Sequence, residues 1–290
     1  MDIYINTNIK VIINFLNLLI IQKMKKIFFK GPFFPKHEDN LMEEEGNVIK
    51  ARQDFLSTRF NNLDFLLSTR YKWMNKYLKK DMNIIEIGAG AGFSKLYLNQ
   101  EVTLTDAASN PWIDRYIDAT NMELPDNSVD IIIASHTIHH FYNPAKFFFE
   151  SLRVLKKDGY ILISEINTSF FMRLLLRVFH HEGYSYDIDI FNTKSIVNDK
   201  NDLWSANCAV PEILFTQEQG FENFFGGLKV QLNEPCEFLL FPLSGGVISK
   251  TKVPRLPNFL LKLAALIDKF LIKILPSVFA LGRKIVIKKE

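Results

Sequence analysis

Apolar and polar positions alternate along the chain in two rhythms, which predict helices and strands in turn. Between residues 47 and 80 apolar side chains return every three or four positions, which predicts one or two helices. Further along, short β-branched runs, which favour buried strands, are separated by turns and by stretches with helical spacing. The predicted strands are 83–87, 102–106, 129–136 and 160–165, the predicted helices are 93–98 and 144–157, and a turn is predicted at Asp158-Gly159. Repeated strand–helix units of this kind predict an α/β fold, with a doubly wound, mostly parallel sheet covered by helices on both faces.

The regular alternation ends after residue 165. Residues 166–227 show no clean period, so we expect them to cap the open end of the sheet. Two apolar runs, 228–232 and 237–243, are predicted as the last strands, and 257–275 as an amphipathic helix that Pro276 ends. The expected organisation has four parts: a partly irregular N-terminal lead-in at 1–46, a ligand-binding core at 47–165, a cap with the final strands at 166–249 and a basic amphipathic tail at 250–290.

The first residues leave two interpretations open. Ile9–Ile21 is an apolar run of about 13 residues, shorter than the roughly 20 that a membrane-spanning helix needs. It is either an amphipathic surface helix or lies upstream of a translation start at Met24, where MKKIFF looks like a natural beginning. A signal peptide is not expected, because the lysines follow the apolar run instead of preceding it.

Composition and charge narrow the classes of protein. With 48% hydrophobic and 23% charged residues, the chain has the composition of an ordinary globular protein. The net charge of +3 is no nucleic-acid signature, but from Lys250 onward ten basic residues stand against two acidic ones. Cys208 and Cys236 have no C-x-x-C spacing, which argues against a disulfide framework and favours the reducing cytoplasm. We therefore expect a cytoplasmic protein with a basic tail and no nucleic-acid partner.

The stretch IIEIGAGAGFS, residues 84–94, places three glycines at every second position directly after a predicted strand. Without a Cβ, these glycines let the chain turn sharply and let a ligand approach the backbone. A dinucleotide site would need its third glycine at position 93, which is Phe93. The pattern is instead E-x-G-x-G-x-G, beginning at Glu86, and this disfavours an NAD-dependent oxidoreductase.

With this motif and those that follow it, residues 80–166 resemble the class I S-adenosylmethionine-dependent methyltransferases, in particular the methyltransferase type 11 group typified by ubiquinone and menaquinone biosynthesis. The resemblance implies a Rossmann-like fold and S-adenosylmethionine as cofactor. Asp106 stands where the family's acid accepts both ribose hydroxyls, although taken alone it could equally cap a helix. Asp118-Ala119 resembles the adenine-binding motif, IIIASH resembles the strand end beside the methyl group, and RVLKKDGYILISE resembles the family's last signature. The implied cofactor-binding residues are Glu86, Gly88, Ala89, Gly90, Gly92, Asp106, Ala107, Asp118, Ala119 and Ser135.

Methyl transfer to oxygen or carbon needs a group that removes a proton, and a neutral imidazole suits that role near pH 7. His136 is nearest to the end of a predicted strand and is the expected base. His139 and His140 are typical of the family at this place, where we expect them to serve packing, and His180 and His181 are rival bases. The spacing of the first three histidines could also make a metal site, but no carboxylate or cysteine accompanies them, so no metal is expected.

The acceptor is less well defined by the sequence. Trp204, with polar Asp202, Ser205 and Asn207 beside it, could stack on and hydrogen-bond a sugar or quinone ring, or could pack within the cap. In the helix at 257–275 a wide apolar stripe runs beside three lysines, which is typical of helices at anionic lipid surfaces. The same stripe could instead pack on the protein's own sheet.

These observations predict an S-adenosylmethionine-dependent methyltransferase that acts on oxygen or ring carbon of a small or lipid-linked acceptor, glycan or quinone-like. Residues 257–289 would give it peripheral contact with the cytoplasmic face of a membrane. The alternatives are a non-catalytic S-adenosylmethionine-binding scaffold or sensor and, less favoured, an NAD-dependent oxidoreductase. The sequence does not predict the oligomeric state.

Overall fold

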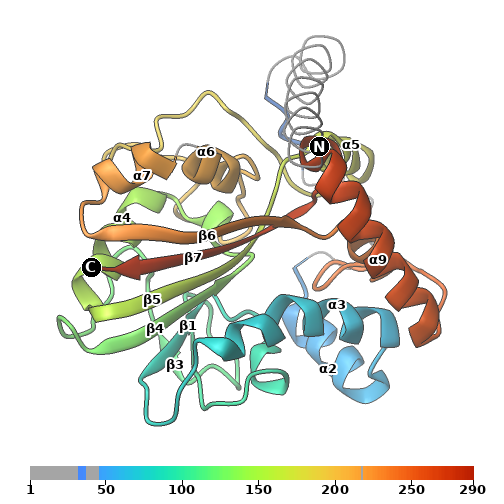
Figure 1. Cartoon of the computed structure of the whole chain (residues 1–290), viewed down its shortest axis with the longest axis horizontal. Helices are drawn as coiled ribbons and strands as arrows, with labels where there is room; N and C mark the ends of the chain where they lie inside the picture. Colours follow the sequence, from blue (N-terminus) through green and yellow to red (C-terminus); the bar gives the residue numbers. More distant parts are fainter. Residues whose placement is uncertain (1–31, 37–45, 217) are drawn as a thin grey trace, which may run out of the picture.

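The computed structural model describes residues 32–36, 46–216 and 218–290. Within this part of the chain, seven strands form one sheet in the order β3-β2-β1-β4-β5-β7-β6 (Figure 1). Strands β1 to β5 run parallel to one another, whereas β7 is antiparallel to both β5 and β6. The strands are β1 Ile84–Ile87, β2 Thr103–Asp106, β3 Arg115–Tyr116, β4 Val129–Ser135, β5 Leu155–Ile166, β6 Leu228–Cys236 and β7 Gly282–Lys289. The expected fold, a mostly parallel, doubly wound sheet, is confirmed.

Helices cover both faces of this sheet (Figure 1). Helices α4, α6 and α7 pack on one face, and α2, α3, α8 and α9 pack on the other. Successive residues of a strand point to opposite faces, so in β7 Ile285 and Ile287 join the first layer and Val286 joins the second. The helices are α2 Val48–Thr58, α3 Asn61–Tyr71, α4 Pro144–Val154, α5 Phe170–Phe179, α6 Val210–Thr216, α7 Glu218–Phe224, α8 Leu240–Leu243, α9 Asn258–Ile274 and α10 Pro276–Phe279, with 3-10 turns η2 Lys72–Lys76, η3 Ser94–Leu96 and η4 Ile138–His140.

Local sequence accounts for several elements. One or two helices were expected before the first strand, and both α2 and α3 form there; the strands expected at β1, β2 and β4 are present. Helix α4 begins where it was predicted: Pro144 occupies its first turn, and the side chain of Asn143 accepts a hydrogen bond from the backbone N–H of Lys146 at 3.0 Å. The predicted amphipathic helix before Pro276 is α9.

The helix predicted at 93–98 is wrong, because only the short turn η3 forms there. Strand β2 begins at Thr103, so few residues are available for the return along the sheet. Helices α2 and α3 cover this face instead, and the ring of Phe55 meets the ring of Phe93 edge-on, with 4.8 Å between centroids.

The strand predicted at 237–243 is also wrong: this segment contains helix α8. The carboxylate of Asp268, on α9, accepts hydrogen bonds from the backbone N–H groups of Phe238 and Leu239, and these groups are then not free to pair with a strand. Proline at position 242 also has no N–H to donate. The last strand is instead β7, which lies between β5 and β6. Residues 282–289, expected in a tail, therefore belong to the central sheet.

The turn predicted at Asp158-Gly159 lies within the span of β5, where the register with β4 shifts: Val129 pairs with Leu155 and Ile131 pairs with Tyr160. Asp158 has a φ of 63°, so the strand bends there without ending. A Cβ on Gly159 would lie 2.9 Å from the carbonyl oxygen of Asp130, which explains why a glycine fits at this close approach.

The segment expected as a cap, 166–227, is divided: residues from α5 to Trp204 border the cavity at the carboxyl edge of the sheet, whereas α6 and α7 pack on one face. Helix α5 and the chain that follows it enclose a third apolar cluster, which includes Ile166, Met172 and Leu176. Cys208 is buried in this cluster, and neither it nor Cys236 forms a disulfide. The predictions for Ile9–Ile21 and Met24 lie outside the described residues. Among those that are described, no helix has the length and apolar character to cross a membrane.

Candidate functional site

A cavity of about 540 Å³ opens at the carboxyl ends of β1, β2 and β4, the edge at which open α/β sheets bind ligands. The turn η4, the segment after α5 and the segment between α8 and α9 complete its walls. Most of the residues predicted to hold the cofactor line it: Gly88, Ala89, Gly90, Asp106, Ala107, Asp118, Ala119 and Ser135. Glu86 and Gly92 are buried outside the lining.

The three glycines of the turn after β1 have different surroundings. A Cβ on Gly88 would lie 2.0 Å from the hydroxyl oxygen of Thr137, and a Cβ on Gly92 would lie 2.8 Å from Leu104. These two glycines therefore allow the turn to pack against its neighbours. Gly90 is different: it lines the cavity, and a Cβ there would have no atom of the described residues within 4 Å. Its missing side chain leaves room for a ligand against the backbone.

Asp106 ends β2 with its carboxylate fixed by two backbone donors. One oxygen accepts a hydrogen bond from the N–H of Gly90 and the other accepts one from the N–H of Ala108, both at 2.8 Å. Each carboxylate oxygen can accept a second hydrogen bond, so the group can still take two hydroxyl donors from a ligand.

Asp118 offers a second acidic position in the lining. Its Oδ1 accepts hydrogen bonds from the backbone N–H and the hydroxyl of Thr120, at 2.8 and 2.7 Å. The cavity wall thus offers open space at Gly90, a fixed carboxylate at Asp106 that can accept further hydrogen bonds, and a second acid at Asp118. These features fit a ligand that has a ribose and a ring with an amino group. On this geometry the residues present fit S-adenosylmethionine.

Glu86 acts from behind the lining. Its buried carboxylate accepts hydrogen bonds from the hydroxyl groups of Ser94 and, at 3.3 Å, Tyr71. Burial raises the pKa of Glu86 to about 7, because these bonds offset only part of the loss of hydration. This carboxyl ties the end of β1 to η3 and to helix α3, and thus holds the glycine turn in place.

His136, the expected base, lines the cavity directly after β4. Its backbone has a φ of 52°, and its N–H donates to the carbonyl oxygen of Ser164 at 2.8 Å. The ring nitrogen Nδ1 is buried and has no hydrogen-bond partner in the described part of the chain. Burial, and then the positive charge of Arg70, lower the pKa of His136 well below its usual value. The ring is therefore neutral at pH 7, and its buried Nδ1 is left without a partner among the described residues.

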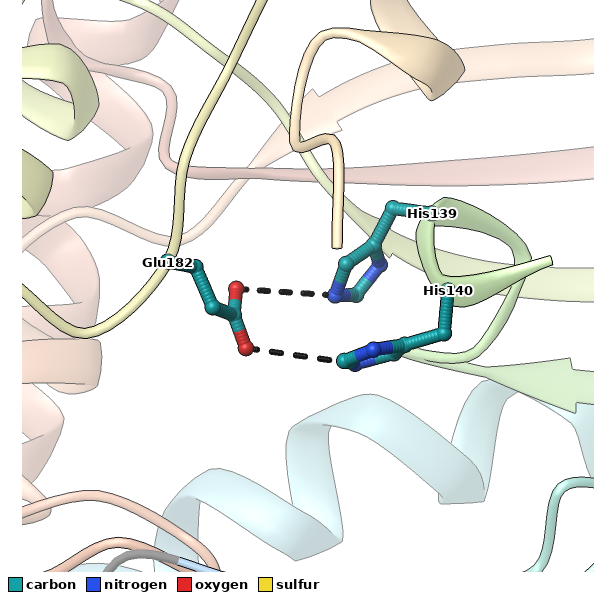
Figure 2. Close-up of side chains that lie close together, drawn as sticks. All are labelled: His139, His140 and Glu182. Atoms are coloured by element: carbon teal, nitrogen blue, oxygen red, sulfur yellow. Dashed lines mark ion pairs between the residues drawn. The ribbon is translucent and has the colours of Figure 1, made fainter. Parts of the chain in front are cut away.

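His139 and His140 also line the cavity, and both rings point toward Glu182 (Figure 2). Nε2 of His139 lies 3.6 Å from one carboxylate oxygen of Glu182, and Nε2 of His140 lies 3.9 Å from the other. The expectation that no carboxylate accompanies these histidines is therefore wrong. Glu182 is more than 40 positions further along the chain, and only the fold brings it here.

The charges in this cluster depend on one another. Burial raises the pKa of a carboxyl, but the neighbouring histidines, His139 first, outweigh it and hold the pKa of Glu182 at about 2. Burial and the charge of His139 lower the pKa of His140 to about 4. For His139, burial is outweighed by the charge and hydrogen bond of Glu165, so its pKa is raised.

The two rival bases are placed differently. His181 lines the cavity, and its Nε2 lies 3.2 Å from the hydroxyl oxygen of Ser249 and 3.6 Å from Glu182. His180 is not among the lining residues: it ends α5 with a φ of 53°, and its ring meets Phe33 edge-on at 5.7 Å. The fold thus brings His181, but not His180, to the site.

Two pairs of residues in or beside the lining were not predicted from the sequence. Arg70 lines the cavity and donates to the carboxylate of Glu237, with Nε and Nη2 at 2.9 and 2.8 Å from its two oxygens. Both side chains are buried, and 167 positions separate them. The second pair is Cys208 and Glu182: the thiol of Cys208 donates a hydrogen bond to the carboxylate of Glu182 at 3.1 Å. Such pairs have no local pattern, so the sequence carries no signal for them.

The region expected to contact the acceptor contributes in part. Trp204 and Asp202 line the cavity, and the Trp204 ring stands edge-on to His140 with 6.5 Å between centroids. Ser205 accepts a hydrogen bond at its backbone oxygen from His140, and the buried side chain of Asn207 holds the backbone of Ser185. Ser205 and Asn207 therefore support the wall without lining it.

One family of known proteins matches part of this chain. Residues 85–163 match the family described as methyltransferase domain. No curated protein matches the chain. Among solved structures, an S-adenosylmethionine-dependent methyltransferase from Archaeoglobus fulgidus is similar, with 19% identity, 82% of this chain and 99% of that chain covered, and a TM-score of 0.47. Another, from Thermotoga maritima and described as a possible histamine N-methyltransferase, has 17% identity, 84% and 96% coverage and a TM-score of 0.47.

The sequence match covers the strands that carry the glycine turn, Asp106, Asp118 and His136. The chain is an S-adenosylmethionine-dependent methyltransferase, and the predictions of this enzyme class and this cofactor are confirmed. The identity of the acceptor does not follow from the match.

Proposed function

We propose that this methyltransferase acts on oxygen or ring carbon of a small or lipid-linked acceptor, glycan or quinone-like, with His136 as general base. One observation supports His136 as the base. This residue lines the cavity, and its buried Nδ1 has no hydrogen-bond partner among the described residues. The resemblance to the ubiquinone and menaquinone group supports a ring acceptor. The cofactor-binding roles of the residues predicted from the sequence, Glu86 and Gly92 included, belong to this proposal.

The chemistry divides between cofactor and protein. S-adenosylmethionine supplies an activated methyl group, so the chain must position the acceptor and remove its proton. Gly90 leaves space for the cofactor, while Asp106 and Asp118 orient it through hydrogen bonds. The neutral ring of His136 then accepts the proton of the acceptor hydroxyl or ring carbon, since its lowered pKa keeps it unprotonated at pH 7. Trp204 offers an aromatic surface for the acceptor ring.

A membrane location is supported by the two faces of α9. One face is buried on the protein through Leu261, Ala264 and Ile272. The other face is exposed although it is apolar: Phe259 is 68% exposed and Phe270 63%. The remaining exposed apolar residues of this face are Leu260, Leu263, Leu266 and Ile267.

Three exposed lysines, Lys262, Lys269 and Lys273, lie on α9 beside this apolar face. An apolar helix face with lysines at its border suits the surface of a membrane with anionic lipids. The segment between α8 and α9 lines the cavity, so a membrane-bound α9 would bring the cavity close to a lipid-linked acceptor. The part of 257–289 that serves this contact is α9, since β7 lies in the sheet. A location at the cytoplasmic face remains part of the proposal.

A methyl-label experiment tests the acceptor class. The purified protein is given S-adenosylmethionine with a labelled methyl group and a cell lysate, which is then separated into lipid and aqueous fractions. We expect label in the lipid fraction with the wild-type protein and loss of that label with His136→Ala. Label confined to the aqueous fraction would contradict a lipid-linked acceptor and leave a small soluble one. Label on amino nitrogen would contradict the oxygen or ring-carbon acceptor.

A further inference from the structure

Three potential metal ligands converge on the cavity wall from two separate segments. They are Nε2 of His139, Nε2 of His140 and the carboxylate of Glu182, and all lie within 4.8 Å of one another (Figure 2). A cation bound at about 2.0–2.2 Å from each ligand atom brings such atoms to about 3–3.5 Å from one another. Small side-chain rotations would close the difference, because each Nε2 already lies 3.6 or 3.9 Å from a carboxylate oxygen of Glu182.

The hydrogen bonds of the two rings decide which nitrogen faces the cluster. Nδ1 of His139 lies 2.7 Å from Oε2 of Glu165, and Nδ1 of His140 lies 3.2 Å from the carbonyl oxygen of Ser205. Both partners are acceptors, so each neutral ring carries its hydrogen on Nδ1. The lone pair on each Nε2 then points toward Glu182, whose ionised carboxylate is also only an acceptor. With both rings neutral, the three acceptor groups repel one another unless a cation lies between them. Without a metal, a proton on His139 supplies the positive charge, in line with the raised pKa of His139.

Glu165 supports the cluster as the outer partner of a metal-binding histidine does. Its Oε1 accepts hydrogen bonds from the backbone N–H groups of Thr137 and Ile138, both at 2.7 Å, and its Oε2 accepts one from Ile166 at 2.8 Å. The carboxylate is therefore fixed and ionised while it accepts from His139. A carboxylate behind a histidine fixes the ring and makes its other nitrogen a better metal ligand.

Direct ion pairing is the competing explanation. A proton on Nε2 would turn each contact into a charge-assisted hydrogen bond, which has a typical length of about 2.7–2.9 Å. The observed separations of 3.6 and 3.9 Å are longer, and Glu182 already accepts a hydrogen bond from the thiol of Cys208 at 3.1 Å. The spacing leaves room between the ligand atoms, which a bound cation would occupy.

We propose that His139, His140 and Glu182 bind one divalent transition-metal ion, with Zn²⁺, Co²⁺ or Mn²⁺ as the fitting class. Two imidazoles and one carboxylate suit these ions, whereas Mg²⁺ prefers oxygen ligands. Three protein ligands leave at least one coordination position open, as in catalytic metal sites. Because all three residues line the cavity, that position faces the space available to an acceptor oxygen. This last consequence rests on the proposed function, but the binding of the metal does not.

The experiment measures metal binding without any acceptor. Full-length protein is stripped with a chelator and dialysed, then titrated with Co²⁺ and with Zn²⁺, and bound metal is counted by mass spectrometry. We expect about one ion per chain, visible absorption from Co²⁺ in a nitrogen and oxygen environment, and no comparable binding of Mg²⁺. Glu182→Gln and His140→Asn should each weaken binding by about 100-fold or more.

His180→Asn is the matched control, because His180 lies near the cluster in sequence but not in the cavity lining, and asparagine tolerates its positive φ. This variant should bind metal like the wild type. Thermal unfolding and S-adenosylmethionine binding report whether each variant folds, and if Glu182→Gln does not fold, His140→Asn carries the test. Metal binding that is absent in the wild type, or unchanged in the folded ligand variants, would overturn the site. Methyl transfer to the acceptor is measured separately, so its failure concerns only the proposed function.

Discussion

The carboxylate of Asp106 accepts a hydrogen bond from the backbone N–H of Gly90, with 2.8 Å between donor and acceptor. This bond joins the end of β2 to the turn after β1, 16 positions earlier in the chain. It fixes the carboxylate and the glycine turn relative to one another. The two features that are proposed to contact the cofactor are therefore held as one unit. Substitutions at either can be tested for their effect on binding.

Asp106→Ala should weaken binding of S-adenosylmethionine by about 1.5–3 kcal/mol, the size of hydrogen bonds to a charged group. Calorimetric titration measures the change. Asp114→Asn is the control, because Asp114 accepts a hydrogen bond from the backbone of Leu104 but does not line the cavity. Unchanged affinity in Asp106→Ala would refute the assignment of ribose recognition to this carboxylate.

Gly90→Val should abolish binding, because its side chain would fill the open space beside the turn. Gly226→Val is the control: within the part of the chain that the structure describes, a Cβ at Gly226 also has no atom within 4 Å, but that glycine is not in the cavity lining. Since Gly90 has a φ of 50°, some loss of stability is expected as well, about 1–2 kcal/mol. Circular dichroism therefore accompanies the binding measurement. A folded Gly90→Val that still binds the cofactor would contradict the placement of the ligand against this turn.

His136→Ala should lower the rate of methyl transfer by about 10²–10⁴ while cofactor affinity stays near the wild-type value. A base must be unprotonated, so the wild-type rate rises as pH rises through the pKa of His136. Since that pKa is well below 6.5, the rise should lie at acidic pH, and the rate should be flat from about 6.5 to 8. His136→Ala should lose the acidic rise. A loss of rate below tenfold would move the role to His181 or show that the acceptor needs no base.

Glu86 should make the stability of the cofactor-free protein depend on pH. Its pKa is raised from 4.5 to about 7 by burial, so the folded state holds the proton more tightly than the unfolded state. The resulting stabilisation is complete below pH 4.5 and is lost as pH rises to about 7, a change of about 3 kcal/mol. Glu86→Gln stays neutral and should not show this loss.

Denaturant unfolding between pH 5 and 8 measures the difference in slope. The exposed Glu101→Gln serves as control and should follow the wild-type curve. If Glu86→Gln and the wild type lose stability in parallel over this range, the raised pKa of Glu86 is refuted.

Helix α9 should bind vesicles that contain anionic lipid but not neutral ones, and added salt should weaken the binding. Each lysine near an anionic surface contributes about 1 kcal/mol, so reversal of the charge at Lys262, Lys269 and Lys273 should release the protein. Leu263→Asp should also release it without unfolding, because Leu263 is 51% exposed. Leu261→Asp, at the buried face, should instead unfold the domain. Equal sedimentation with neutral and anionic vesicles, or with none, would contradict the membrane contact.

The sequence by itself determined the elements whose cause is local. The β-branched run before the glycines gives β1, the apolar spacing between residues 47 and 80 gives α2 and α3, and Asn143-Pro144 begins α4. The turn residues and the acids after β1 and β2 predict a cofactor site because the carboxyl ends of parallel strands meet at one edge. Because these residues follow successive parallel strands, most of the predicted cofactor residues lie in one cavity.

Only the tertiary structure decided the elements and contacts that depend on distant segments. The basic run at 282–289 becomes a central strand because β5 and β6 offer it hydrogen bonds on both sides, whereas Asp268 binds the N–H groups that a strand at 237–243 would need. Glu182 reaches His139 and His140 only because the segment after α5 folds over the carboxyl edge of the sheet. Side-chain charge and hydrogen bonding act over a few ångströms in space, so pairs far apart in sequence leave no pattern from which such a cluster could be predicted.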